Sequence, residues 1–177
     1  IEGGVQDIQH ISFMDDDLAA LAHKHNCRVT PTSWVLEEFL NIDGVSDFVA
    51  DKLHKVAESH SNAVKAAHYS GLPVLAGTDP FLPGMHGQND RELAALHREG
   101  LPGLTAWYGA TGLAAAEIGQ DDSGVIAPGY RADLLVLADD VFEDPGKFDT
   151  GTLQEVFKDG ITYRNYWREI PSNSFAQ

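Results

Sequence analysis

The chain has 177 residues, 43% of them hydrophobic and 22% charged, which is the composition of a folded globular protein and not of a disordered one. Its formal net charge is -15 and no cluster of Lys or Arg reverses that sign locally, so nucleic acids and anionic membranes are excluded as partners. Cys27 is the only cysteine, so the fold cannot depend on an internal disulfide framework.

The first half of the chain alternates predicted strands and helices. The order is strand, helix, strand, helix, strand, over residues 5–11, 15–22, 28–32, 45–69 and 73–76. Three aspartates, Asp15 to Asp17, suit the N-terminal dipole of the first helix, and Gly71 is a stop signal for the second. This alternation is typical of parallel βα units.

The second half begins with a loop over 80–88 and a helix over 90–98. Residues 104–118 are helical in composition, but Gly109 and Gly112 interrupt them, which predicts two short helices or a close packing contact. From residue 123 the pattern changes to strands and turns. Pro128-Gly129 separates two extended runs, and Asp159-Gly160 predicts a hairpin turn. We therefore expect one domain over 1–122 and another over 123–177.

Two residues that follow predicted strands are candidates for catalysis. Asp79 ends the run Leu72 to Asp79, and His10 ends the first predicted strand. Because parallel strands present their carboxyl ends at one edge, both side chains are expected there, where an imidazole and a carboxylate suit a divalent metal such as zinc. The alternatives are an Asp-Pro turn for Asp79 and a hydrogen-bonded histidine at a strand end for His10.

The other histidines are weaker candidates. His23 and His25 follow a predicted helix, where side chains two residues apart point about 200° from each other, so we do not interpret them as a metal site. Those on the long helix and on the helix over 90–98 are expected at the surface: His54, His60, His68 and His97. His86 lies in the loop after Asp79 and is a candidate substrate contact, although a solvated loop histidine is the simpler interpretation.

Several ordered segments together resemble the C-terminal portion of the metal-dependent amidohydrolase superfamily, in the branch that holds imidazolonepropionase-like, prolidase-like and ochratoxinase-like enzymes. Three segments are similar to the sixth, seventh and eighth barrel strands of that family: Gly4 to His10, Val29 to Thr32 and Val74 to Asp79. Later ones resemble the helix after the barrel and the returning strands of its small β-sandwich: Ala110 to Gly119, Gly124 to Leu137 and Lys158 to Gly160.

The resemblance implies an α/β fold, the last three strands of a (β/α)8 barrel plus part of a β-sandwich, with one or two divalent ions, of which zinc is expected. It implies hydrolysis of an amide C–N bond in a dipeptide or an N-acyl amino acid. Asp79 would bind metal, take a proton from the attacking water and deliver it to the leaving amine. His10 would bind a second metal or polarise the substrate carbonyl. Hydrolysis of a cyclic amide of the imidazolone type is the alternative reaction.

This sequence lacks the His-x-His of the first strand, the lysine of the fourth and the histidine of the fifth that similar proteins carry. Three strands cannot close a barrel of eight, and open strand edges invite pairing. We therefore expect the missing N-terminal half of the barrel, or a partner chain that supplies it, and a homo-oligomer. A scaffold without catalysis is the other class of function.

No apolar run reaches the roughly 18 residues of a membrane span, and the opening Ile1 to Gly4 does not resemble a signal peptide. These features favour a soluble and cytoplasmic protein. Secretion stays open if the natural chain starts elsewhere.

Overall fold

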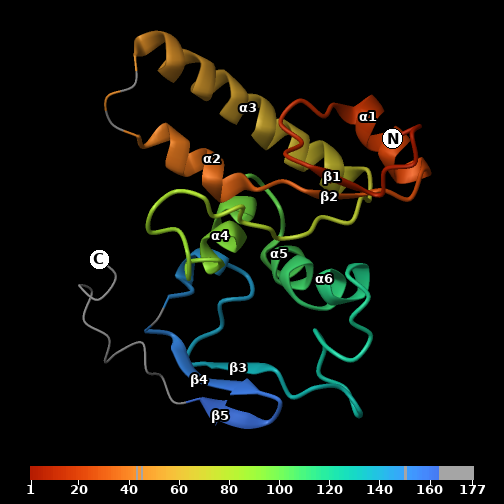
Figure 1. Ribbon diagram of the computed structural model, residues 1–177, viewed down its shortest axis with the longest axis vertical. Helices are drawn as coiled ribbons and strands as arrows, with labels where there is room; N and C mark the ends of the chain where they lie inside the picture. Colours follow the sequence, from red (N-terminus) through yellow and green to blue (C-terminus); the bar gives the residue numbers. More distant parts are fainter. Residues whose placement is uncertain (43, 45, 150, 164–177) are drawn as a thin grey trace.

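The computed structural model describes residues 1–42, 44, 46–149 and 151–163, and Figure 1 shows how their elements are arranged. The first elements are β1 (Asp7–Gln9), α1 (Asp16–Lys24), β2 (Arg28–Thr30), α2 (Ser33–Leu40) and α3 (Asp47–Tyr69). The later ones are α4 (Asp90–Arg98), α5 (Gly103–Ala110), α6 (Gly112–Glu117), β3 (Leu134–Leu137), the 3₁₀ helix η1 (Pro145–Lys147), β4 (Leu153–Lys158) and β5 (Ile161–Tyr163). Among the described helices, none is long and apolar enough to cross a membrane.

Three parallel segments lie side by side in chain order. β1 pairs with β2 with Ile8 opposite Val29, and Val29 forms a further parallel bridge with Val74. The Val29 N–H donates to the Pro73 carbonyl at 2.9 Å, and the Leu75 N–H donates to the Val29 carbonyl at 2.8 Å. The predicted succession of parallel βα units is confirmed, although all three strands are shorter than the sequence pattern predicts and the third is reduced to a bridge at Val74.

Small apolar side chains pack α1 and α3 against these segments. Ala19 and Ala22 of α1 and Ala63, Val64 and Ala67 of α3 are all fully buried, in one cluster with Val29 and Val74. Short side chains let helices approach a sheet closely. Burial on α3 is confined to its C-terminal half. At its other end Phe48 is 67% exposed, where α3 extends past the parallel segments (Figure 1).

Local sequence signals set the helix ends as predicted. The Leu18 N–H donates to Asp15 Oδ1 at 2.9 Å, so Asp15 caps α1. After α3 the chain turns at Gly71, whose φ is 77°.

The interruption at Gly109 and Gly112 separates α5 from α6 and also permits a close contact. A Cβ at Gly109 would lie 2.4 Å from the Val74 carbonyl oxygen, and the Gly109 carbonyl accepts the Ala76 N–H at 3.1 Å. A second close contact lies at Gly77, where a Cβ would be 2.5 Å from Thr30 Cγ2. Both glycines let another segment approach the strand that leads to Asp79.

An antiparallel sheet in the order β3, β4, β5 follows the helices. Asp159 and Gly160 have φ of 51° and 75°, as a type I′ hairpin turn needs, so the predicted hairpin is confirmed. The predicted extended run before Pro128 is wrong. There the Tyr130 N–H donates to Ala127 and the Arg131 N–H to Asp122, so the chain bends back on itself instead of pairing. The expected tail over 164–177 lies outside the described residues.

Candidate functional site

His10 and Asp79 meet at the carboxyl ends of the parallel segments. His10 follows β1 directly, and Asp79 ends the segment that begins at Pro73. Their facing atoms, His10 Nε2 and Asp79 Oδ2, are 3.6 Å apart. The two side chains are 55% and 50% exposed, so solvent and small molecules can reach both.

The backbone at this edge is held in an uncommon conformation. His10, Thr32 and Asp79 have φ of 53°, 59° and 44°, and each follows one of the three parallel segments. The left-handed region costs an L-residue on the order of 1–3 kcal/mol, and threonine, which is β-branched, is rare there. Such strain persists where surrounding contacts enforce it, and it is concentrated at functional sites.

Thr32 sets the orientation of the His10 ring. The Thr32 hydroxyl donates its one proton to the Pro31 carbonyl at 2.6 Å. His10 Nδ1 lies 2.6 Å from the same hydroxyl oxygen, so it must be the donor in that hydrogen bond. In neutral His10 the proton is then on Nδ1, and the lone pair of Nε2 points towards Asp79 Oδ2.

Two electron-rich atoms that face each other repel unless a proton or a metal ion lies between them. Imidazole nitrogen and carboxylate oxygen are good ligands for divalent ions, and two ligands of one tetrahedral zinc ion lie about 3.3 Å apart. The observed 3.6 Å therefore fits a shared ion. Within the described ranges no group of three or more possible metal ligands occurs, so the pair falls short of the three or four protein ligands of a zinc site.

The remaining predicted residue, His86, is exposed in the loop that joins Asp79 to α4. Within the part of the chain that the structure describes, it forms no hydrogen bond or ion pair with His10 or Asp79.

The expectation that His60 lies at the surface is wrong, because this side chain is only 1% exposed. Its Nδ1 lies 3.1 Å from the Ser12 hydroxyl and its Nε2 lies 3.1 Å from the Ser33 hydroxyl. The signal that could have revealed it is its spacing from Ala63, Val64 and Ala67, which places His60 on the buried face of α3.

Glu92, fully buried on α4, explains why the sequence does not predict α2. Thr32 at the start of that helix makes no capping hydrogen bond with its side chain. The Ser33 and Trp34 N–H groups donate instead to Glu92 Oε1 and Oε2, at 2.9 Å and 2.8 Å. Since this cap comes from a residue 59 positions away from Ser33, a local pattern does not reveal it.

Burial shifts the ionisation of these groups. Desolvation, with a smaller contribution from His10, lowers the pKa of His60 to about 4. Desolvation also raises the pKa of Glu92 to about 7 and that of Glu99 to about 7. His60 is therefore neutral at neutral pH.

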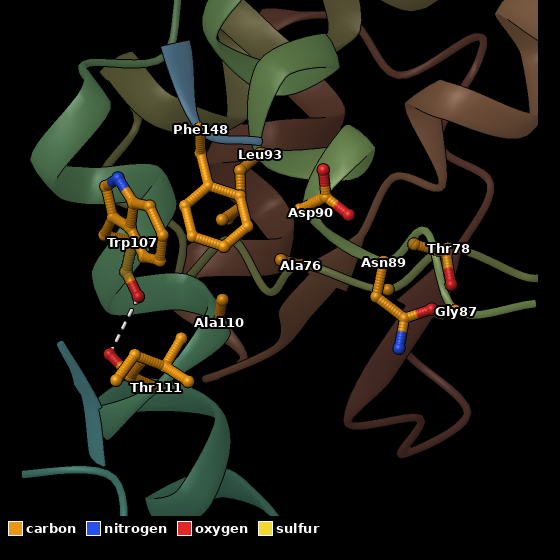
Figure 2. Close-up of a pocket in the computed structure, with 12 residues that line it drawn as sticks. Ala76, Thr78, Gly87, Asn89, Asp90, Leu93, Trp107, Ala110, Thr111 and Phe148 are labelled. Carbon is orange, nitrogen blue, oxygen red and sulfur yellow. Dashed lines mark hydrogen bonds between the residues drawn. The ribbon is translucent and has the colours of Figure 1, made fainter. Parts of the chain in front are cut away.

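Figure 2 shows a cavity of about 480 Å³. Neither His10 nor Asp79 is among its lining residues. Its lining includes Thr78, Asn89 and Asp90 on the polar side and Trp107 and Phe148 on the apolar side. The two aromatic rings meet edge to face, with their centroids 5.5 Å apart. The Thr111 hydroxyl donates to the Trp107 carbonyl at 2.8 Å. Thr78 is the residue before Asp79, so the cavity extends to the edge of the site.

Comparison with known proteins agrees with this architecture. The model of the amidohydrolase family matches residues 1–163. The chain belongs to the amidohydrolase family. Members of this family generally use divalent metals.

Among relatives of this amidohydrolase, ochratoxinase of Aspergillus niger is 29% identical over 185 residues, which cover 99% of this chain and 38% of the relative. An uncharacterized protein of Mycobacterium tuberculosis is 32% identical over 160 residues, covering 82% of this chain and 40% of its own length.

Solved structures of other amidohydrolases superpose well. The crystal structure of A. niger ochratoxinase has a TM-score of 0.79 at 28% identity, over 92% of this chain and 38% of the other. A Xaa-Pro dipeptidase with methionine bound in its active site has a TM-score of 0.77 at 27% identity, over 92% of this chain and 41% of the other. This amidohydrolase chain thus spans about 40% of the length of the proteins that it matches and is a partial barrel fold of the α/β class.

Proposed function

We propose that the complete protein is a metal-dependent hydrolase that cleaves the amide C–N bond of a dipeptide or an N-acyl amino acid. The observation that carries this proposal is the position of His10 Nε2, which bears no proton in the neutral ring and lies 3.6 Å from Asp79 Oδ2 in a member of the amidohydrolase family. The similarity to a Xaa-Pro dipeptidase supports the dipeptide as the substrate class.

The two side chains would have separate tasks. A bound divalent ion, for which we propose zinc, supplies a water of lowered pKa and polarises the scissile carbonyl. His10 Nε2 and Asp79 Oδ2 would hold that ion, and the other carboxylate oxygen of Asp79 would accept the proton of the attacking water. The same oxygen then returns the proton to the leaving amine. His86 is proposed as a contact to the distal part of the substrate.

The rest of the barrel would cover the open side of β1. A groove there is lined by Ile1, Val5, Ile8, Phe13 and Leu18. Phe13 is 72% exposed and Val5 51%, which is much apolar surface to leave in water. We propose that the preceding barrel strand and helix, on the same chain or on a partner chain, pack into this groove and bring the remaining metal ligands.

The experiment uses the full-length protein with bound metal. We expect metal analysis to find zinc, and removal of the metal with a chelator should abolish hydrolysis of Xaa-Pro dipeptides and N-acyl amino acids, with recovery on addition of zinc. Asp79→Asn and His10→Asn should each lower the metal content and the activity. Asp121→Asn and His54→Asn, at exposed positions, serve as matched controls.

Full activity in the metal-free protein, or in Asp79→Asn, would contradict the mechanism. A metal-free native protein without activity on any of these amides would favour the scaffold class.

A further inference from the structure

Behind the exposed pair, four buried or half-buried residues from four different elements form one chain of hydrogen bonds. Ser12 belongs to the loop after β1, His60 to α3 and Ser33 to the first turn of α2, while Glu99 caps the C-terminus of α4. The distances along this chain are 3.1 Å from Ser12 to His60, 3.1 Å from His60 to Ser33 and 2.5 Å from Ser33 to Glu99.

When Glu99 is ionised, the protons in this chain have one consistent arrangement. The Ser33 hydroxyl donates its one proton to Glu99 Oε2, so it can only accept from His60. His60 therefore carries its proton on Nε2, and its Nδ1 accepts from the Ser12 hydroxyl. Burial favours the same neutral ring. Every polar atom of the His60 ring thus has a partner, as a buried imidazole requires.

Two members of the chain, Ser12 and Ser33, connect it to the backbone of the site. On one side, the Ser12 N–H donates to the His10 carbonyl at 2.8 Å. On the other side, Ser33 follows Thr32, whose hydroxyl accepts from His10 Nδ1. His60 therefore joins the loops after β1 and β2 on the buried side. The hydrogen bond between His10 and Thr32 joins the same two loops next to the exposed site.

We infer that His60 is a positioning residue that fixes the spacing of these two loops and thereby the orientation of the His10 ring towards Asp79. This inference rests on the proposed function for its effect on catalysis, but its effect on His10 does not depend on that function. Residues in the left-handed region need such outside constraints, and His10 and Thr32 are both in it.

Four substitutions test the two links that His60 makes, to Ser12 and to Ser33. In His60→Asn the side-chain oxygen can replace Nδ1 and keep the link to Ser12, whereas in His60→Gln the side-chain NH₂ can replace Nε2 and keep the link to Ser33. His60→Leu removes both links. Ser12→Ala removes only the link between Ser12 and His60. Because Ser12 is half-buried, this variant provides a test even if His60→Leu does not fold.

The first measurement is ¹⁵N NMR of the His10 ring in the full-length, metal-free protein. We expect the Nδ1–H form in the parent. His60→Leu should convert this signal to a mixture of both tautomers, with smaller changes in His60→Asn, His60→Gln and Ser12→Ala. His54→Leu, on the exposed face of α3, should leave the signal unchanged.

The second measurement is steady-state kinetics with metal restored. We expect kcat to fall about 10-fold in His60→Leu with little change in KM, because the orientation and tautomer of a metal-binding histidine determine how well it binds the ion. A folded His60→Leu or Ser12→Ala protein with the parent's His10 signals and kcat would overturn the inference. If His10→Asn keeps full activity, the proposed function fails, while the NMR result still decides the role of His60.

Discussion

The exposed pair of His10 and Asp79 and the buried chain around His60 place similar residues under opposite conditions. In the pair, one nitrogen lone pair and one carboxylate face each other across 3.6 Å and are open to solvent. In the chain, the imidazole is 1% exposed and both of its nitrogens have partners. Only the pair has electron pairs left for a cation or a proton from outside, so chemistry is expected there and rigidity is expected from the chain.

The largest expected effect comes from Asp79→Asn. Asparagine tolerates the left-handed backbone and has a similar shape, so the free energy of unfolding should change little. Without a carboxylate to accept the proton, kcat of the full-length enzyme should fall on the order of 100-fold or more. Steady-state kinetics and urea unfolding measure the two quantities. A large loss of stability would mean that the pair is structural, like the chain.

Glu92→Ala tests the buried side of the comparison. It leaves the N–H groups of Ser33 and Trp34 without their acceptor, so the free energy of unfolding should fall by about 3 kcal/mol. Urea unfolding of the full-length protein measures this change, with Glu58→Ala on the exposed face of α3 as the control. An unchanged unfolding midpoint would show that α2 does not need this cap.

Thr32→Val removes one hydroxyl at the junction of the two regions and keeps the branched shape. His10 then loses its acceptor, and the affinity for metal or kcat should fall about 10-fold. Thr32→Ser keeps the hydroxyl and should behave like the parent. Metal titration and kinetics check this. Equal losses of metal affinity or kcat in Thr32→Val and Thr32→Ser would point to backbone strain instead.

The smallest effect is a pH dependence. Because the pKa of His60 is about 4 in the folded protein and ordinarily 6.5, the unfolded chain binds more protons between these values. The stabilisation from neutral His60 is thus present above pH 6.5 and is lost as the pH falls towards 4. The stability gap between the parent and His60→Gln should therefore narrow over this range, by at most about 1.4 kcal/mol per pH unit.

Urea unfolding from pH 4 to 7 measures that gap. Glu92 and Glu99, whose pKa values are raised to about 7, titrate in both proteins, so the difference between the two curves isolates His60. A gap that stays constant or widens towards acid would contradict the buried, neutral state of His60.

The sequence predicts what depends on neighbours along the chain. The βα alternation and the positions of His10 and Asp79 at strand ends are of this kind, as are the Asp15 cap and the Asp159-Gly160 turn. Their common physical basis is short-range, in hydrophobic periodicity, capping and turn conformation.

Features that depend on distant residues escaped prediction. α2 starts where Glu92 supplies its cap, and the role of Thr32 appears only once its hydroxyl is seen beside His10. His60 has charged and polar neighbours in sequence, and only the packing of α3 reveals that it is buried. These contacts join residues 22 to 66 positions apart, beyond the reach of local patterns.

The absence of a side chain at Gly77 has a geometric consequence for the site. Gly77 lies two residues before Asp79 and faces Thr30, which lies two residues before Thr32. The missing methyl group allows the two strands to converge just beneath their functional ends. The width of the site is therefore set by the packing one layer below it. A single methyl group at Gly77 would widen the site while every functional side chain kept its chemical identity.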